Sequence, residues 1–252
     1  MIEVKNIEKS FEGNHVLKNV SAIFETGKTN MIIGQSGSGK TVLMKSIIGL
    51  HRIDKGRIEY DGRNLPDMQM KEIRILRREV GMLFQGSALF DSLSVLENVM
   101  YPLEMFSDST SEEMVERARF CLRHVSLAEK SYGLAPSEIS GGMQKRVAIA
   151  RAIALQPKYL FCDEPNSGLD PKTSLIIDQL IHEITHEFDI TTIINSHDMN
   201  SVMEIGENII FIDKGIMAWQ GNKGDIFHVD NEALNDFVFA SELYKQVKRA
   251  NQ

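Results

Sequence analysis

The chain has few of the residues that mark small secreted or metal-stapled domains. Its 252 residues include 2 cysteines, 6 prolines and 1 tryptophan. Cys121 and Cys162 lie far apart, and neither has a second cysteine at metal-ligand spacing. We therefore expect a reduced protein of the cytosol, with a hydrophobic fraction of 42% that can form a sizeable core.

Long apolar runs and an excess of positive charge are also missing. No apolar run reaches the roughly 18 residues of a membrane span, and residues 1–9 carry charges where a signal peptide would be apolar. The 28 basic and 35 acidic residues leave a formal charge of -7, which argues against nucleic acid as the main partner. If the protein acts at a membrane, we expect it to associate peripherally with the membrane surface rather than to span the bilayer.

One motif is present in full. Residues 34–41 read GQSGSGKT and fit the phosphate-binding pattern G-x-x-x-x-G-K-[ST], between a strand expected at 31–33 and a helix expected at 41–48. Lys40 would reach the terminal phosphates, and the Thr41 hydroxyl would bind Mg²⁺. The alternative is a glycine-rich surface loop. The residues expected to hold ATP are Gly34, Gln35, Ser36, Gly37, Ser38, Gly39, Lys40, Thr41 and Val42.

A second motif is an apolar strand, 159–162, that delivers two adjacent acids, Asp163 and Glu164, at its C-terminal edge. Ligands of open α/β sheets gather at that edge. Asp163 would hold Mg²⁺, and Glu164 would orient or polarise the attacking water. Without a phosphate loop elsewhere in the chain, such a pair would indicate only a solvated acidic loop.

The hydrophobic pattern divides the chain into three regions. A β region comes first, followed by a helical region over about 86–156 and then by alternating strands and helices, which predicts a parallel sheet with a helical insertion. Thr110 and Glu113 form a capping box before helix 114–122, and Pro157 ends a helix at 143–155. The other expected strands are 2–9, 16–24, 57–60 after a turn at 55–56, 80–84, 190–195 and 209–212, and the other helices are 171–188 and one after His197.

Residues 140–146, Ser-Gly-Gly-Met-Gln-Lys-Arg, resemble the signature motif of ATP-binding-cassette (ABC) ATPases, and they lie between the two phosphate motifs as in that family. A small hydroxyl and bare N–H groups at a helix N-terminus suit an anion. In the family, this element caps the γ-phosphate held by the other subunit, so the resemblance implies a head-to-tail homodimer. The residues concerned are Ser140, Gly141, Gly142, Met143 and Gln144.

The resemblance covers residues 2–225 and implies a fold class. It is an α/β P-loop cassette with a mixed-sheet RecA-like core, an N-terminal antiparallel β subdomain and a helical subdomain inserted at about 86–157. Residues 226–252 would form a C-terminal helical extension. Leu234, Phe237, Val238 and Leu243 stand at helical spacing there, to pack on a neighbouring subunit or on their own domain, and 244–249 reads as a frayed tail.

Other family positions are filled. Phe11 matches the aromatic that stacks on adenine, although an ordinary strand aromatic is the alternative. Gln85 resembles the glutamine that contacts Mg²⁺ and water, and His197 the histidine that contacts the γ-phosphate. With Lys40 and Glu164, these two complete the expected catalytic set. The loop that crosses the dimer seam in the family corresponds to Ser167, Gly168, Leu169 and Asp170, the last of which also suits a helix N-cap.

Residues 85–99 and 101–103 resemble the matching segment of Mla-type ATPases of bacterial phospholipid transport, and Met143 points the same way. This implies an MlaE-like permease bound near 85–101, an MlaD-like MCE-domain protein, and a peripheral place on the cytoplasmic face of the inner membrane. Ile139 in place of leucine and Gln35 in the phosphate loop are mild departures. A permease-free cassette of the iron–sulfur assembly type, or a cassette for another substrate, would share every catalytic residue.

One pattern competes with this interpretation. His182, Glu183 and His186 satisfy H-E-x-x-H, the zinc-protease pattern, and Glu204 could be offered as a third ligand. Asp189 and Thr192 stand where the metzincin pattern needs Gly and His. The apolar positions of helix 171–188 instead place Asp178, Gln179, His182 and His186 on a solvated face, which favours an ordinary surface helix.

Overall fold

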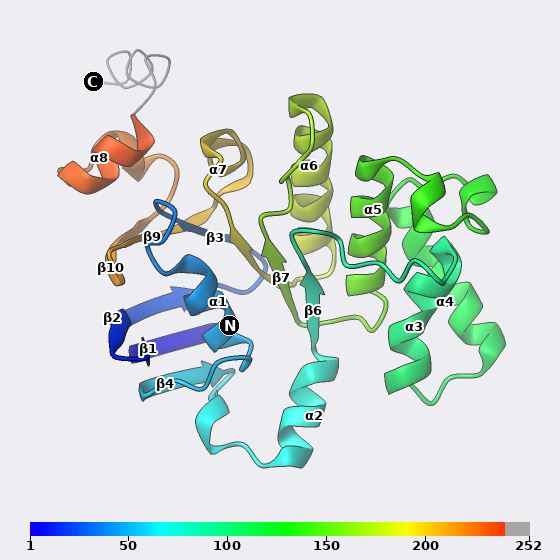
Figure 1. The fold of residues 1–252 in the computed structure, drawn as a ribbon, viewed down its shortest axis with the longest axis horizontal. Helices are drawn as coiled ribbons and strands as arrows, with labels where there is room; N and C mark the ends of the chain where they lie inside the picture. Colours follow the sequence, from blue (N-terminus) through cyan, green and yellow to red (C-terminus); the bar gives the residue numbers. More distant parts are fainter. Residues whose placement is uncertain (240–252) are drawn as a thin grey trace. The chain divides into compact units, whose positions relative to one another are not determined.

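The computed structural model describes residues 1–239 and divides into two compact units. The first unit comprises Met1–Gln69 and the described residues from Thr191 onward, and the second comprises Met70–Ile190 (Figure 1). Leu243 and the stretch 244–249 lie outside the described residues. Among residues 1–239, no helix combines the length and the apolarity that crossing a bilayer requires.

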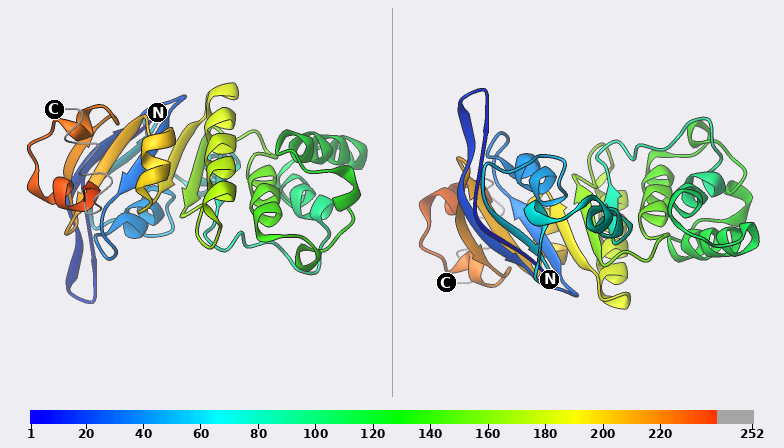
Figure 2. Two further views of the ribbon diagram at one scale, coloured as in Figure 1. Left: turned by 90° about the horizontal axis from the view of Figure 1, so that it is seen from above. Right: turned by 90° about the horizontal axis from the view of Figure 1, so that it is seen from below.

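An antiparallel sheet opens the first unit. Its strands run in the order β2 (Asn14–Phe24), β1 (Ile2–Phe11), β4 (Lys55–Tyr60) and β5 (Arg63–Asn64). Both views of Figure 2 show β1 and β2 as a long hairpin. The turn expected at 55–56 is wrong, because these residues begin β4, where Lys55 pairs with Glu8. Gly56 fits there because a Cβ atom would lie 2.5 Å from the Lys5 and Asn6 carbonyl oxygens.

A second set of strands in this unit runs in the order β10 (Ile216–Gly221), β9 (Asn208–Asp213), β3 (Thr29–Ile33) and β8 (Thr191–Asn195). β3 is parallel to β8 and β9, whereas β10 is antiparallel to β9. The strands are therefore mixed, as the cassette resemblance implies, and not all parallel. The helices of this unit are α1 (Lys40–Ile47), α7 (Met199–Ile205) and α8 (Glu232–Val238), with short turns η1 (Leu65–Asp67) and η4 (Asp225–Phe227).

The second unit contains the parallel pair β6 (Val80–Leu83) and β7 (Tyr159–Asp163). Its helices are α2 (Met70–Arg78), α3 (Val95–Phe106), α4 (Ser111–His124), α5 (Gly141–Ala152) and α6 (Pro171–Glu187), with short turns η2 (Glu129–Ser131) and η3 (Pro136–Glu138). The capping box of α4 is confirmed, because Glu113 N donates to the Thr110 hydroxyl while Thr110 N donates to the Glu113 carboxylate. Helix α3 begins with the same device, formed by Ser94 and Glu97.

Helix α5 begins and ends earlier than the expected 143–155. Its N-terminus lies directly after Ser140, so both signature glycines are helical. At its other end, the Arg117 guanidinium donates hydrogen bonds to the carbonyls of Ile153 at 2.8 Å and Ala154 at 3.0 Å. Arg117 thereby satisfies carbonyls that lack partners inside the helix. The helix can therefore end before it reaches Pro157.

Both cysteines are free and buried. Burial raises the pKa of the Cys121 thiol to about 11, and it also raises the pKa of Cys162. A thiol that stays protonated is a poor nucleophile and a poor metal ligand. These two side chains therefore belong to the core.

Candidate functional site

The phosphate loop lies in the first unit, between β3 and α1. Gly34, Gly37 and Gly39 all have positive φ, of 146°, 81° and 110°. At Gly34 a Cβ atom would lie 2.2 Å from the Ile212 carbonyl oxygen, so only glycine fits. Lys40 folds back over the loop, and its ammonium donates to the carbonyls of Gly34 at 2.8 Å and Gln35 at 3.0 Å.

This loop has the properties of a phosphate site. The first turn of α1 contains no acidic residue to offset the positive end of the helix dipole. The Ser38 hydroxyl oxygen is buried and has no hydrogen-bond partner among residues 1–239, and the space next to Gly37 is open. Thr41 is exposed, with a hydroxyl of the type that Mg²⁺ binds. The residues present therefore fit Mg·ATP.

Two further predicted residues belong to the same unit. Phe11 ends β1 with 39% of its surface exposed. The His51 ring contacts it edge-on, with 5.2 Å between ring centroids, and the Lys9 ammonium lies 5.0 Å from its centroid. His197 is exposed in the short link between β8 and α7.

The second unit gathers the acidic pair and Gln85 at one edge. Leu83 pairs with Cys162 in the parallel strands β6 and β7, so Gln85 and Glu164 both lie just beyond the C-terminal ends of these strands. The Gln85 amide donates to the Ser167 hydroxyl at 3.1 Å. Glu164 has a φ of 48°, which non-glycine residues seldom adopt and which recurs at functional sites. Asp163 and Glu164 are both half-buried.

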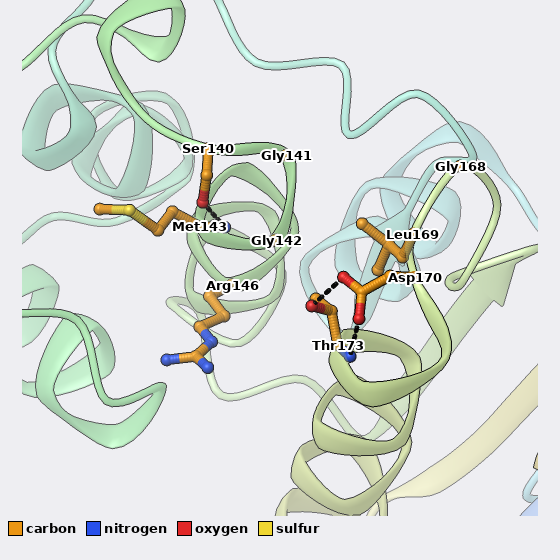
Figure 3. Close-up of a pocket in the computed structure, with 9 residues that line it drawn as sticks. All are labelled: Ser140, Gly141, Gly142, Met143, Arg146, Gly168, Leu169, Asp170 and Thr173. Carbon is orange, nitrogen blue, oxygen red and sulfur yellow. Dashed lines mark hydrogen bonds between the residues drawn. The ribbon is translucent and has the colours of Figure 1, made fainter.

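The signature residues line a pocket of about 360 Å³ in the same unit (Figure 3). Ser140 is the N-cap of α5, and Met143 N donates to its hydroxyl at 3.3 Å. The first turn of α5 contains no acidic residue. The lining residues are Ser140, Gly141, Gly142, Met143, Arg146, Gly168, Leu169, Asp170 and Thr173. The structure thus brings two predicted groups together, residues 140–143 and 168–170. Gln144 is not in this lining; its amide donates to the Pro136 carbonyl at 2.9 Å.

Asp170 forms the opposite wall of this pocket by capping α6. Its carboxylate accepts hydrogen bonds from the Thr173 hydroxyl at 2.5 Å, from Thr173 N at 3.0 Å and from Lys172 N at 3.1 Å. The Thr173 hydroxyl and then the Thr173 N–H are the largest causes of a lowered pKa at Asp170. The N-cap role expected for Asp170 is confirmed.

Some residues at these sites were not expected. Thr173 packs against the signature glycine Gly142, where a Cβ atom would lie 2.7 Å from the Thr173 methyl group. Thr173 follows the helix N-cap Asp170 by three residues, and this spacing could have indicated from the sequence that the two side chains contact each other. Lys145 and Arg151, both on α5, donate to backbone carbonyls of residues 85–88. Nothing in the sequence pattern indicates those long-range contacts.

The H-E-x-x-H residues lie on α6. The rings of His182 and His186 contact each other, with centroids 4.4 Å apart. Gln179 and His186 are exposed and His182 is half-buried, but the expectation of a solvated Asp178 is wrong. Asp178 is buried, and the Asn166 amide donates to its carboxylate at 2.8 Å, which compensates for the loss of water.

A glycine-rich phosphate loop, a strand that ends in two acidic residues and a second glycine-rich helix N-terminus at α5 define a P-loop nucleotide-binding protein. The family described as ABC transporter matches residues 17–167. Among curated relatives, the methionine import ATP-binding protein MetN of Clostridium acetobutylicum is 40% identical over 96% of this chain and 75% of its own length. The glutamine transport ATP-binding protein GlnQ of Escherichia coli is 40% identical over 88% of this chain and 91% of its own length.

Solved structures agree with this fold. The dimeric post-hydrolysis structure of the ATP-binding cassette MJ0796, bound to ADP and Pi, has a TM-score of 0.80 and 33% identity over 88% of this chain and 98% of its own. CbiO1 from Clostridium perfringens, part of the ABC transporter complex cbiONQ, has a TM-score of 0.84 and 28% identity over 99% of this chain and 97% of its own.

The chain belongs to the ABC transporter family. It is an ATP-binding subunit that hydrolyses ATP with Mg²⁺, and the expected fold class is confirmed. The relatives named above are amino-acid transport proteins rather than Mla-type ATPases. They favour the alternative interpretation, a cassette for another substrate, over phospholipid transport.

Proposed function

We propose that this chain is the ATP-hydrolysing subunit of an importer for a small polar solute of the amino-acid class. The observation that supports the motor activity is a pair of helix N-termini, at α1 and at α5, that have glycines beside them and no acidic residue in the first turn. The relatives MetN and GlnQ support the cargo class.

In this proposal each predicted residue has a separate task. Lys40 and the N–H groups of the phosphate loop bind the phosphates, and Phe11 stacks on the base. Thr41, Asp163 and Gln85 would supply oxygen ligands of the kind that Mg²⁺ prefers. When bound, Mg²⁺ neutralises the charge that develops on the phosphates. Glu164 holds and polarises the attacking water, and His197 contacts the γ-phosphate.

The pocket at α5 serves a second copy of the chain. A γ-phosphate in that pocket would accept hydrogen bonds from Ser140 and from N–H groups at a helix N-terminus with no acid in its first turn. The loop 167–170 shares this pocket, so it would lie at the same seam. Binding of ATP would close two copies and hydrolysis would reopen them, which would move a membrane permease from its cytoplasmic face.

Phospholipid remains a second candidate cargo. MetN and GlnQ both match at 40% identity although their names give different amino acids, so this degree of identity does not fix the cargo. The segment 85–103, in contrast, resembles Mla-type ATPases. It exposes Phe90 and Tyr101, whose ring centroids lie 4.6 Å apart, on a surface that would receive a permease of the MlaE type together with an MCE-domain protein.

One purification tests both cargoes. The tagged protein is isolated from detergent-solubilised membranes of its host, and co-purifying proteins and lipids are identified by mass spectrometry. A permease with an amino-acid-binding protein would support the importer. A permease with an MCE-domain protein and bound phospholipid would replace the cargo, and soluble partners alone would favour the permease-free cassette.

A pair of variants locates the permease contact. Tyr101→Ser should reduce permease recovery at least about fivefold, because aromatic anchors dominate interfaces. Ile216→Ser on β10 is the control, since Ile216 is also an exposed apolar residue but belongs to the other unit. Equal recovery with both variants would contradict a contact near residues 85–101.

A further inference from the structure

The backbone that follows Gln85 is strained. Ser87 and Ala88 have φ values of 62° and 49°, in the left-handed region that non-glycine residues seldom occupy. Ser87 N donates to the Phe84 carbonyl at 2.9 Å, and Ala88 N donates to the Gly86 carbonyl at 2.7 Å. A turn of this kind persists only when surrounding contacts determine it.

Two cations of the signature helix α5 supply such contacts. Lys145 donates from its ammonium to the Gln85 carbonyl. Arg151 donates from one guanidinium nitrogen to the Ala88 carbonyl at 2.7 Å and from the other to the Ser87 carbonyl at 2.7 Å. The planar guanidinium presents its donors in a fixed fork, so it can hold two successive carbonyls in one geometry.

The burial of Lys145 indicates that this contact is specific. Only 4% of the residue is exposed, and burial lowers the pKa of its ammonium. Burial likewise lowers the pKa of Arg151. A buried cation is costly unless it is well hydrogen-bonded, and an apolar side chain would serve packing alone at least as well. The reason for a lysine at position 145 is therefore the hydrogen bond that it donates to the Gln85 carbonyl.

Gln85, which accepts this hydrogen bond, connects two functional segments. The backbone of Gln85 is bound by Lys145, while its side-chain amide donates to Ser167 at 3.1 Å in the loop after Glu164. A continuous set of contacts thus runs from α5, which begins directly after Ser140, through Gln85 to the loop 167–170. All of these residues belong to the second unit.

We propose that Lys145, supported by Arg151, is a positioning residue for ATP hydrolysis that holds Gln85 in place from the signature helix. This inference rests on the role proposed above for Gln85. The role assigned to Lys145 requires no contact with nucleotide or metal; its contribution is to the placement of Gln85 and through it to kcat.

Two substitutions at position 145 separate the hydrogen bond from packing. Lys145→Met keeps the length but removes the donor, and it should lower kcat about 10- to 100-fold because small misplacements at an active site have effects of that size. The KM for Mg·ATP should change less than about twofold. Lys145→Gln retains an N–H donor and should recover most of kcat. Lys130→Met, at an exposed lysine of the same unit, is the control.

A double-mutant cycle with Gln85→Ala tests whether Lys145 acts through Gln85. The full-length subunit, with the membrane partners that co-purify with it, is assayed for ATPase activity and for its unfolding temperature. The loss caused by Lys145→Met should largely vanish in the Gln85→Ala background. Losses that multiply independently, or failure of Lys145→Gln to recover kcat in a folded protein, would overturn this inference alone. Normal turnover of Gln85→Ala would overturn the proposed role of Gln85 and this inference with it.

Discussion

At the scale of single residues, the site depends on close approaches that only small or precisely capped side chains allow. Gly142 in the signature helix faces the methyl group of Thr173, while the Thr173 hydroxyl is fixed by Asp170. The Thr173 side chain therefore cannot rotate away without losing a hydrogen bond to the cap. At Gly141, one position earlier, a Cβ atom would lie 3.9 Å from the Leu169 Cδ2 atom, which is an ordinary van der Waals contact.

Gly142→Ala should consequently lower the free energy of unfolding by about 1–3 kcal/mol, the usual cost of overpacking. Urea unfolding measures this, with Gly141→Ala as the matched control, for which we expect less than about 1 kcal/mol. Combining Gly142→Ala with Thr173→Ser removes the opposing methyl group and keeps the hydroxyl. If that double variant were no more stable than Gly142→Ala alone, the contact would not be the cause.

At the scale of elements, hydrogen-bonded caps fix where helices begin. Helices α3 and α4 both start with a capping box, at Ser94 with Glu97 and at Thr110 with Glu113. The box of α4 was readable because Thr110 precedes a clear apolar period. Helix α3 lies within the region 86–156 that was expected to be helical, but its bounds were not predicted; it contains Pro102, although proline is unfavourable in a helix interior.

The Thr110 N–H and hydroxyl, which contact Glu113, lower the pKa of its carboxyl below the ordinary 4.5. Because the folded-state pKa is the lower one, this stabilisation is complete above pH 4.5 and is lost as the pH falls through the folded-state value. We expect the stability difference between the wild type and Glu113→Gln to shrink as urea midpoints are measured from pH 7 down to about pH 3. Glu112→Gln, in the same first turn, is the control. A difference independent of pH would contradict the assignment.

At the scale of the whole molecule, the two anion sites proposed for one chain imply two copies. Dimeric cassettes such as MJ0796 share this fold. In the proposed cycle, ATP binding closes the dimer and ATP hydrolysis reopens it. The two steps can be separated by substituting a residue that takes part in hydrolysis but does not bind the nucleotide. In the function proposed here that residue is Glu164.

Glu164→Gln should retain ATP binding and lower kcat at least about 100-fold, since removing a general base has effects of 10²–10⁴. ATP should then trap the variant as a dimer, which light scattering detects as a doubled mass. Glu183→Gln changes an exposed glutamate of the same unit and should behave as the wild type. Normal steady-state hydrolysis by Glu164→Gln would be incompatible with the assignment.

The sequence alone determined the features that depend on local geometry. The glycines of residues 34–41, the strand that ends at Asp163, the cap at Asp170 and the box at Thr110 are each recognisable because backbone conformation and capping involve neighbours within a few positions. The cassette resemblance added the mixed sheet and the residues of the signature. No local pattern indicated the buried Asp178, whose partner Asn166 lies on another segment.

Tertiary structure decided what depends on contacts between distant segments. It placed the signature residues 140–143 and the loop 168–170 around one pocket, and it brought Lys145 and Arg151 of α5 onto the carbonyls that follow β6. A lysine or an arginine in a helix is most often a solvated surface residue, and only packing makes it a buried donor. The motifs thus follow from the order of residues, whereas the contacts that hold Gln85 follow only from the fold.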